Sequence, residues 1–250
     1  MTTTEIAKAI RNDLILYVDQ SRRESIAISH PTSMKVFGLK VADLRKVIDK
    51  WRKILSPFSE AQWIALSIEL VDNDILECQL IAYEFLWKNK KALQAMSVEH
   101  ILTLGKNLDN WASVDVYCLC ITGYSWRTGN LQDKTIEHWA MSENRWVRRK
   151  ALVSTVPLNL RARGGTGDAK RTLRICSLLV SDKDDMVVKA MSWALRELSK
   201  SDLQAVIQFM EVYKDTLHSR VKREVETKLR TGKKKDDNKH INSVTFVPAN

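Results

Sequence analysis

Hydrophobic residues recur every three to four positions along almost the whole chain, which is the spacing of one face of an α-helix. Within residues 41–55 the apolar positions are Val41, Leu44, Val47, Ile48, Trp51 and Leu55. No segment alternates apolar and polar residues over a length typical of a β-strand. The pattern therefore predicts an all-α protein.

Several residues indicate where helices begin and end. Ser59 and Gln62 have the spacing of a capping box. Ser97 and His100 have the same spacing, but histidine is a weaker match to the motif. Pro157 and the glycine-rich run at 163–168 are expected to break the chain between helices.

Four helical segments, residues 77–86, 143–156, 184–198 and 218–229, share one rhythm of apolar and small residues. Their alignment on Ala82, Ala151, Ala190 and Val225 gives spacings of 69, 39 and 35 residues. The first spacing is about twice the others, and residues 110–118 fill that gap. A helical repeat of roughly 35–40 residues is typical of HEAT units, which stack because one pair cannot bury its own apolar face.

We therefore expect a right-handed superhelix of HEAT-like antiparallel helix pairs. Residues 1–231 are predicted to form a single domain. Residues 232–250 are predicted to be a basic, disordered tail.

Composition agrees with a helical chain, since it contains 8 glycines and 4 prolines among 250 residues and 44% hydrophobic residues. The net charge of +10 is unevenly placed. Residues 1–125 hold 15 basic and 15 acidic residues, whereas residues 126–250 hold 25 and 15. Basic residues concentrated on predicted helices favour an anionic partner such as nucleic acid, although a solvated surface explains the same pattern.

Most enzyme classes with readable motifs are excluded. The chain has no P-loop, no zinc-protease or base-deaminase motif and no Gly-x-Ser-x-Gly elbow, and its five histidines lack the spacing of metal ligands. We predict four reduced, mostly buried cysteines and no bound metal. There is no apolar stretch of about 18 residues and no signal peptide, so we expect no membrane partner and an intracellular protein.

Two charged side chains lie beside tryptophans at helical spacing. Trp111 and Asp115 are four residues apart and share one helix face, and Lys189 and Trp193 have the same spacing. Burying an unpaired aspartate is costly, so Asp115 either serves a site or forms a cap or salt bridge with a neighbouring helix. A tryptophan on a repeat helix is also a common core residue.

Four segments in order resemble the AlkD-like DNA alkylation repair family. They are MKVFGLKVADLRKV (34–47), LDNWASVD (108–115), SENRWVRRKALVSTV (142–156) and DMVVKAMSWALRE (185–197). The resemblance covers roughly residues 20–230 and implies a HEAT-like superhelix.

The resemblance implies a monofunctional DNA glycosylase that hydrolyses the N-glycosidic bond of cationic purines, such as N3-methyladenine and N7-methylguanine, in base excision repair. It places the catalytic aspartate at Asp115, with Trp111 and Trp193 flanking it. It places the phosphate-contacting arginine at Arg149, with Arg148 as the competing assignment, and we add Lys189 as a third phosphate contact.

The implied partner is double-stranded DNA carrying alkylated bases. The enzyme is expected to need no cofactor and to be a monomer. Its location would be the cytoplasm, with the bacterial nucleoid, or the nucleus of a eukaryotic cell.

Two departures from the family pattern leave another function open. Ala42 stands where the family's motif has a proline, which removes a preorganised helix start. The aromatic residue that some members present from their first helices has no clear counterpart near residues 26–33. The alternative is a non-catalytic helical-repeat module that binds DNA or a protein.

Overall fold

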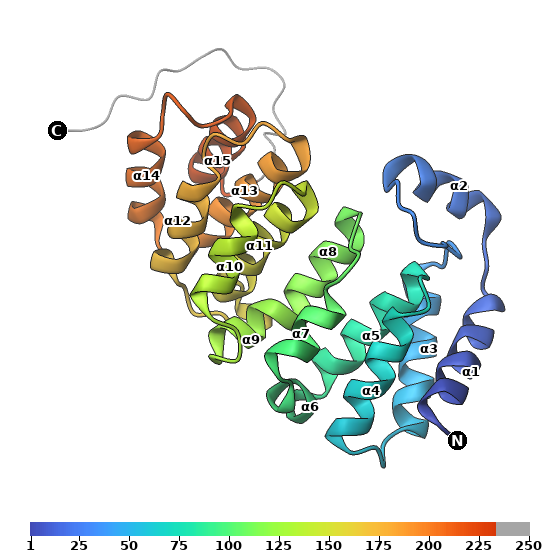
Figure 1. The fold of residues 1–250 in the computed structure, drawn as a ribbon. Coiled ribbons are helices and arrows are strands. Elements are labelled where there is room, and N and C mark those ends of the chain that lie inside the picture. The colour runs from blue at the N-terminus through green and yellow to red at the C-terminus, as the bar shows by residue number, and fades with distance from the viewer. Residues whose placement is uncertain (234–250) are drawn as a thin grey trace.

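The computed structural model describes residues 1–233, which form a curved stack of helices (Figure 1). The helices are α1 (Thr3–Ile15), α2 (Gln20–Ser29), α3 (Val41–Ile54), α4 (Glu60–Val71), α5 (Leu76–Lys88), α6 (Lys90–Ala95), α7 (Val98–Leu104), α8 (Trp111–Tyr117), α9 (Gly123–Arg127), α10 (Asp133–Ala140), α11 (Arg145–Asn159), α12 (Ala169–Leu178), α13 (Asp185–Leu198), α14 (Leu203–Val212) and α15 (Ser219–Thr231). Within these residues the extended structure is one isolated parallel bridge between Lys35 and Ile75.

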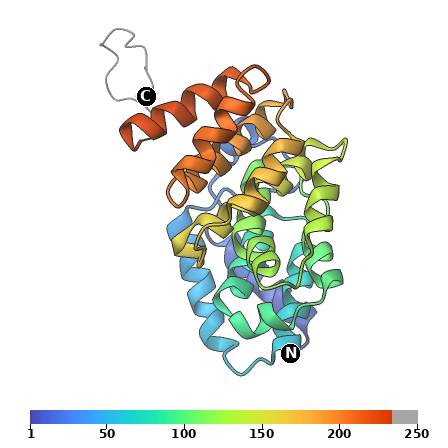
Figure 2. The same ribbon diagram turned by 90° about the vertical axis from the view of Figure 1, so that its left-hand side faces the viewer.

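One row of helices runs the length of the molecule. In this row α3 contacts α5, α5 contacts α8, α8 contacts α11, α11 contacts α13, and α13 contacts α15. A second layer packs against it, with α4 on α5, α10 on α11 and α12 on α13. The predicted all-α, right-handed superhelix of HEAT-like antiparallel pairs is confirmed. Figure 2 shows α1 and α15 near opposite ends of the molecule.

The helix starts agree with the sequence predictions. Both the Ser59–Gln62 and the Ser97–His100 pairs form complete capping boxes. Helix α3 begins at Val41 although the next residue is an alanine in place of proline, and the N-cap Lys40 gives no side-chain hydrogen bond. Proline at this position is therefore not required for the helix to form.

The prediction that Pro157 breaks the chain is wrong, because Pro157 lies inside α11. It lies two residues before the helix end at Asn159, and it lacks the amide that would donate to the carbonyl four residues earlier. Its ring fits against Gly123, where an added Cβ would come within 2.4 Å of the proline side chain. The break at the glycine-rich run is confirmed, since α11 ends at Asn159 and α12 starts at Ala169.

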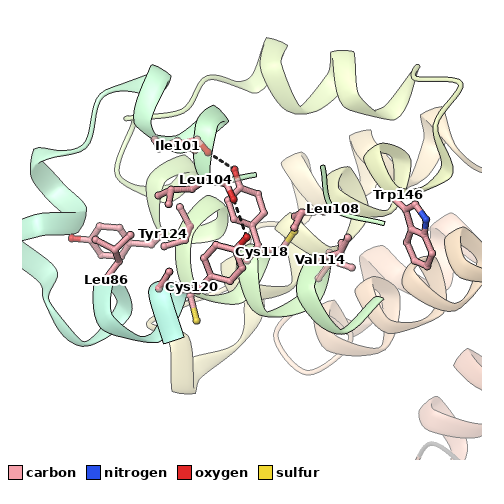
Figure 3. Close-up of a cluster of buried hydrophobic side chains, with 14 of the residues drawn as sticks. Leu86, Ile101, Leu104, Leu108, Val114, Cys118, Cys120, Tyr124 and Trp146 are labelled. Carbon is pink, nitrogen blue, oxygen red and sulfur yellow. Dashed lines mark hydrogen bonds between the residues drawn. The ribbon is translucent and has the colours of Figure 1, made fainter. Parts of the chain in front are cut away.

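The core fills the space between the two layers (Figure 3). Two buried tyrosines satisfy their hydroxyls there, since Tyr83 donates to the Leu104 carbonyl at 2.8 Å and Tyr117 donates to the Ile101 carbonyl at 2.6 Å. All four cysteines are buried free thiols, as predicted. Burial raises the pKa of each thiol to about 12, so none is a reactive thiolate at neutral pH.

Residues 1–233 contain neither a helix that could span a bilayer nor a cluster of metal-ligating side chains. Helix α15 ends at Thr231, and Gly232 caps it in the left-handed conformation. Apart from Gly232 and Lys233, the predicted tail at 232–250 lies outside the described residues.

Candidate active site

Helix α8 lies in the middle of the arc and carries the first candidate pair (Figure 1). Asn110 caps this helix, because its side chain accepts a hydrogen bond of 2.9 Å from the Ser113 amide. Trp111, the first helical residue, and Asp115 share one face and are both partly exposed, as their spacing predicted. The cap therefore fixes where the helix starts and which side its tryptophan and aspartate take.

Asp115 forms a two-pronged ion pair with Arg149 of α11. The Arg149 Nε donates to Oδ1 at 2.9 Å and its Nη2 donates to Oδ2 at 2.8 Å. The Asp115 side chain is 14% exposed and that of Arg149 is 6% exposed. Parallel hydrogen bonds of this kind fix a carboxylate in orientation as well as in charge. Asp115 thus does make the salt bridge to a neighbouring helix that its spacing left open.

The carboxyl of Asp115 has a shifted ionisation. Burial raises its pKa above the usual value of 3.8, and the hydrogen bonds and positive charge of Arg149 oppose that rise. The guanidinium therefore keeps a nearly buried carboxyl available as a carboxylate.

The same arginine connects this pair to α13. Its Nη1 donates to the Met186 carbonyl at 2.5 Å, in the first turn of α13. Trp193 follows Met186 by seven residues, which places both on the same side of that helix about two turns apart. The structure joins Asp115 and Arg149 directly, whereas Trp193 makes no hydrogen bond or ring contact with either among residues 1–233. Trp193 is half-buried against the core.

The other two basic candidates lie nearer the surface. Arg148 donates through Nε to Asp182 at 2.6 Å and through Nη1 to the Ser142 and Glu143 carbonyls. Lys189 pairs with Asp185 at 2.6 Å, and its side chain is 38% exposed. Arg149 is the most buried of the three arginine and lysine candidates, and Lys189 is the most accessible.

Sequence reasoning missed His30, which directly follows α2. Its imidazole stacks on the indole of Trp111 with ring centres 4.0 Å apart and planes at 27°. The Trp111 Nε1 also donates to the Ser29 carbonyl at 3.2 Å. An aromatic ring therefore does lie within residues 26–33, the segment in which the sequence offered no clear aromatic counterpart.

The segment 29–33, which we call the strap, fastens to the start of α8. Thr32 donates to Asp109 Oδ1 and the Ser33 amide donates to its Oδ2, both at 2.5 Å. Burial alone would raise the pKa of Asp109, but these hydrogen bonds outweigh it and lower that pKa below 3.8. An ionised Asp109 at neutral pH keeps the strap in place beside Trp111.

Glu77 of α5 fixes the chain that follows the strap. Its buried carboxylate accepts hydrogen bonds from the consecutive amides of Phe37, Gly38 and Leu39, at 3.0, 2.7 and 3.3 Å. Gly38 has a φ of +80°, and an added Cβ there would lie 2.5 Å from the Asp19 carbonyl oxygen. Glycine is needed at this position because of both the conformation and the close approach.

A π-helical turn, Cys118–Thr122, directly follows α8 and leads into α9. Its first amide, that of Cys118, donates to the backbone carbonyls of Val114 and Asp115. Irregular turns of this type occur frequently at functional sites. Here the turn changes the register of the helix immediately beyond the aspartate.

The family model of the DNA alkylation repair enzyme matches residues 10–229 of this chain. The chain belongs to the DNA alkylation repair enzyme family. This membership confirms the resemblance seen in the four sequence segments, and it supports a role in the repair of alkylated DNA.

A solved structure supports the fold of this DNA alkylation repair family member. The structure described as a predicted DNA alkylation repair enzyme from Enterococcus faecalis superposes with a TM-score of 0.67 and 18% sequence identity. The match covers 85% of this chain and 97% of that one. At this identity the likeness shows the fold alone. No curated protein matches the chain.

Proposed function

We propose that this family member is a monofunctional DNA glycosylase that excises cationic alkylated purines. The observation that supports the proposal is the Asp115 carboxylate, which Arg149 holds in a fixed orientation on the same helix face as Trp111. A preorganised negative charge of this kind stabilises positive charge that develops in a transition state.

The substrate's own charge explains why a single carboxylate suffices. A purine methylated at N3 or N7 is already positive, so it leaves as a neutral base when the C1′–N9 (N-glycosidic) bond breaks and its electron pair returns to the ring. No proton has to be donated to the leaving group. The deoxyribose becomes an oxocarbenium ion, and water then attacks C1′ and loses a proton, which leaves an abasic site.

Asp115 is the residue that acts in this reaction. Two acceptor positions of its carboxylate are occupied by Arg149, and a carboxylate has about four, so it can still face the sugar or accept a proton from water. A single preorganised group of this kind contributes roughly 3–4 kcal/mol, or 10²–10³ in rate.

The surrounding residues bind and orient the substrate. The indoles of Trp111 and Trp193 would attract the cationic sugar and base, at roughly 0.5–2 kcal/mol each. Arg149 acts as the positioning residue of Asp115 in the state described, and a phosphate contact would require it to leave that pair. Lys189, the most exposed candidate, is therefore the phosphate contact that we favour.

Base release from methylated duplex DNA tests the proposal. Wild-type protein should release 7-methylguanine and 3-methyladenine, detected by chromatography, and should leave abasic sites. Uracil and hypoxanthine should stay attached, because these neutral bases lack the built-in activation of the leaving group.

Binding without base release would contradict the glycosylase proposal. It would support the alternative of a non-catalytic repeat module. A steep fall of log K with log[salt] would then identify DNA as the partner, and a shallow fall would favour a protein.

A further inference from the structure

A second group of charged side chains lies beyond Asp115, at the far end of the segment formed by α8 and α9. Along α8 and α9, Arg127 follows Trp111 by 16 residues, which corresponds to about 24 Å. Near Arg127 lie Lys90 at the start of α6 and Arg163 in the 3₁₀ turn after α11. We call these three residues the basic cluster.

The cluster surrounds two aromatic rings. The Lys90 Nζ lies over the Trp87 ring and 5.2 Å from the centre of the Tyr124 ring. The Arg163 guanidinium lies 4.5 Å from the Trp87 ring centre, and that of Arg127 lies 5.5 Å from that of Tyr124. Figure 3 shows Tyr124 at one edge of the buried core, so apolar side chains back the cluster on that side.

Negative charge does not balance these cations. Glu84 is the acidic side chain in contact with the cluster, and its Oε1 lies 3.9 Å from the Arg163 Nη2. Arg127 donates to the carbonyls of Arg163 and Pro157 at 2.9 and 3.4 Å, which explains its position at a helix end. Lys90 has no such explanation, because its ammonium has no hydrogen bond or ion pair in residues 1–233.

The ionisation of Lys90 agrees with this imbalance. Desolvation, together with the positive charges of Arg163 and Arg127, lowers its pKa to about 8 against the opposing charge of Glu84. Lys90 is exposed, and Arg127 and Arg163 are partly buried. Like charges held together repel one another, and a bound anion removes that cost.

We propose that Lys90, Arg127 and Arg163 form a second binding site, which takes a tetrahedral oxyanion such as a phosphate group. The three cations gather around the same two rings, and they offer arginine forks suited to phosphate oxygens and a lysine as a point charge. The phosphate belongs either to the backbone of nucleic acid or to a small phosphate-bearing molecule. The site is independent of the glycosylase proposal, because it uses none of the residues near Asp115.

Titration of the protein with inorganic sulfate and phosphate by calorimetry tests this site. Sulfate keeps its charge between pH 7 and 10, so any pH dependence comes from the protein. We expect millimolar binding by the wild type, and about tenfold weaker binding by Lys90→Gln and by Arg163→Gln. Lys91→Gln, which changes the exposed neighbouring residue, should bind as the wild type does.

The pH dependence gives a second readout. Sulfate binding by the wild type should weaken as pH rises through 8, while Lys90→Arg should keep its affinity up to pH 10. Equal binding by wild type and Lys90→Gln, or no binding at 50 mM sulfate, would overturn the proposal.

Competition identifies the source of the phosphate. If an undamaged DNA duplex displaces sulfate and Lys90→Gln lowers the salt slope of DNA binding by about 0.9, the ligand is the DNA backbone. If duplex DNA leaves sulfate binding unchanged, the ligand is a small phosphate compound. Excision of 7-methylguanine is measured separately, so neither result depends on glycosylase activity.

Discussion

The two ends of the central helices differ in how their charged side chains are paired. At the end where α8, α11 and α13 begin, the Asp115 carboxylate pairs with the Arg149 guanidinium, and their side chains are 14% and 6% exposed. At the other end, three cations lie together, and among residues 1–233 one partly exposed carboxylate, Glu84, pairs with one of them, Arg163. The first arrangement is complete without a ligand, whereas the second has an excess of positive charge.

This difference indicates what each end can do. A matched pair holds its carboxylate in one orientation, which is the requirement for stabilising a cation that exists only in a transition state. An unmatched cluster instead lowers the free energy of a ligand that carries permanent negative charge. Catalysis and anion binding are therefore assigned to opposite ends of the same helices.

Removing one cation from each end should change the free energy of unfolding by very different amounts, and this is the largest effect that we expect. Arg149→Met leaves Asp115 buried without its partner and should lower the free energy of unfolding by about 3–5 kcal/mol at neutral pH. Lys90→Met removes a cation that contacts two rings but has no hydrogen bond or ion pair among residues 1–233, and it should change that free energy by no more than about 0.5 kcal/mol. Urea unfolding followed by circular dichroism measures both, and similar losses would refute the contrast.

The fall of excision rate at acidic pH tests the role of the ion pair between Asp115 and Arg149. Because burial raises the pKa of Asp115, excision should fall with decreasing pH above 3.8, where an ordinary aspartate would still be ionised. Arg149→Gln removes the group that opposes the rise, so its activity should fall at higher pH still. Single-turnover rates between pH 4 and 8 give both curves.

If the excision rate of Arg149→Gln falls at the same acidic pH as that of the wild type, Asp115 is not the titrating group. Arg148→Gln is the matched control, because Arg148 pairs with Asp182 and not with Asp115. Its curve should coincide with that of the wild type.

The stacked pair of His30 and Trp111 should have a smaller effect. Aromatic pairs contribute about 0.5–1.5 kcal/mol, so His30→Ala should slow excision by roughly 2–13-fold if the stack orients the indole. Burial lowers the pKa of His30, so it is neutral at pH 7.5, and His30→Phe should retain the wild-type rate there. Equal losses in both variants would assign His30 another role.

The helices and the pairing of Trp111 with Asp115 could be predicted from the sequence, because both depend on the spacing of residues along one helix. A 3.6-residue period buries one face of a helix, and residues four apart on it must share a side, which fixed Trp111 beside Asp115. Pro157 does not break the helix, and its packing against Gly123 is a contact between distant segments that local spacing does not reveal.

Long-range contacts explain what sequence reasoning missed. His30 is 81 positions from Trp111, and a single histidine after a helix carries no pattern that identifies its partner. The pairing of Arg149 with Asp115 likewise depends on how α8 meets α11. The residues of the basic cluster come from three separate helix ends, so no sequence motif identifies the cluster.

Substitution of Lys189 should have the smallest effect, which is a change in the salt dependence of DNA binding. Neutralising one phosphate contact lowers the slope of log K against log[salt] by about 0.9, so Lys189→Gln should show that decrease on any duplex sequence. Lys134→Gln on α10, an exposed position in the outer layer, is the control and should leave the slope unchanged. A change in sequence preference would contradict a phosphate contact.

The most direct test of the central claim compares Asp115→Asn with the wild type. Asparagine keeps the shape of the side chain and removes its charge, and circular dichroism and DNA affinity verify that fold and binding persist. We predict that single-turnover release of 7-methylguanine falls by about 10²–10³. Release at the wild-type rate would contradict the assignment of Asp115 as the group that stabilises the sugar cation.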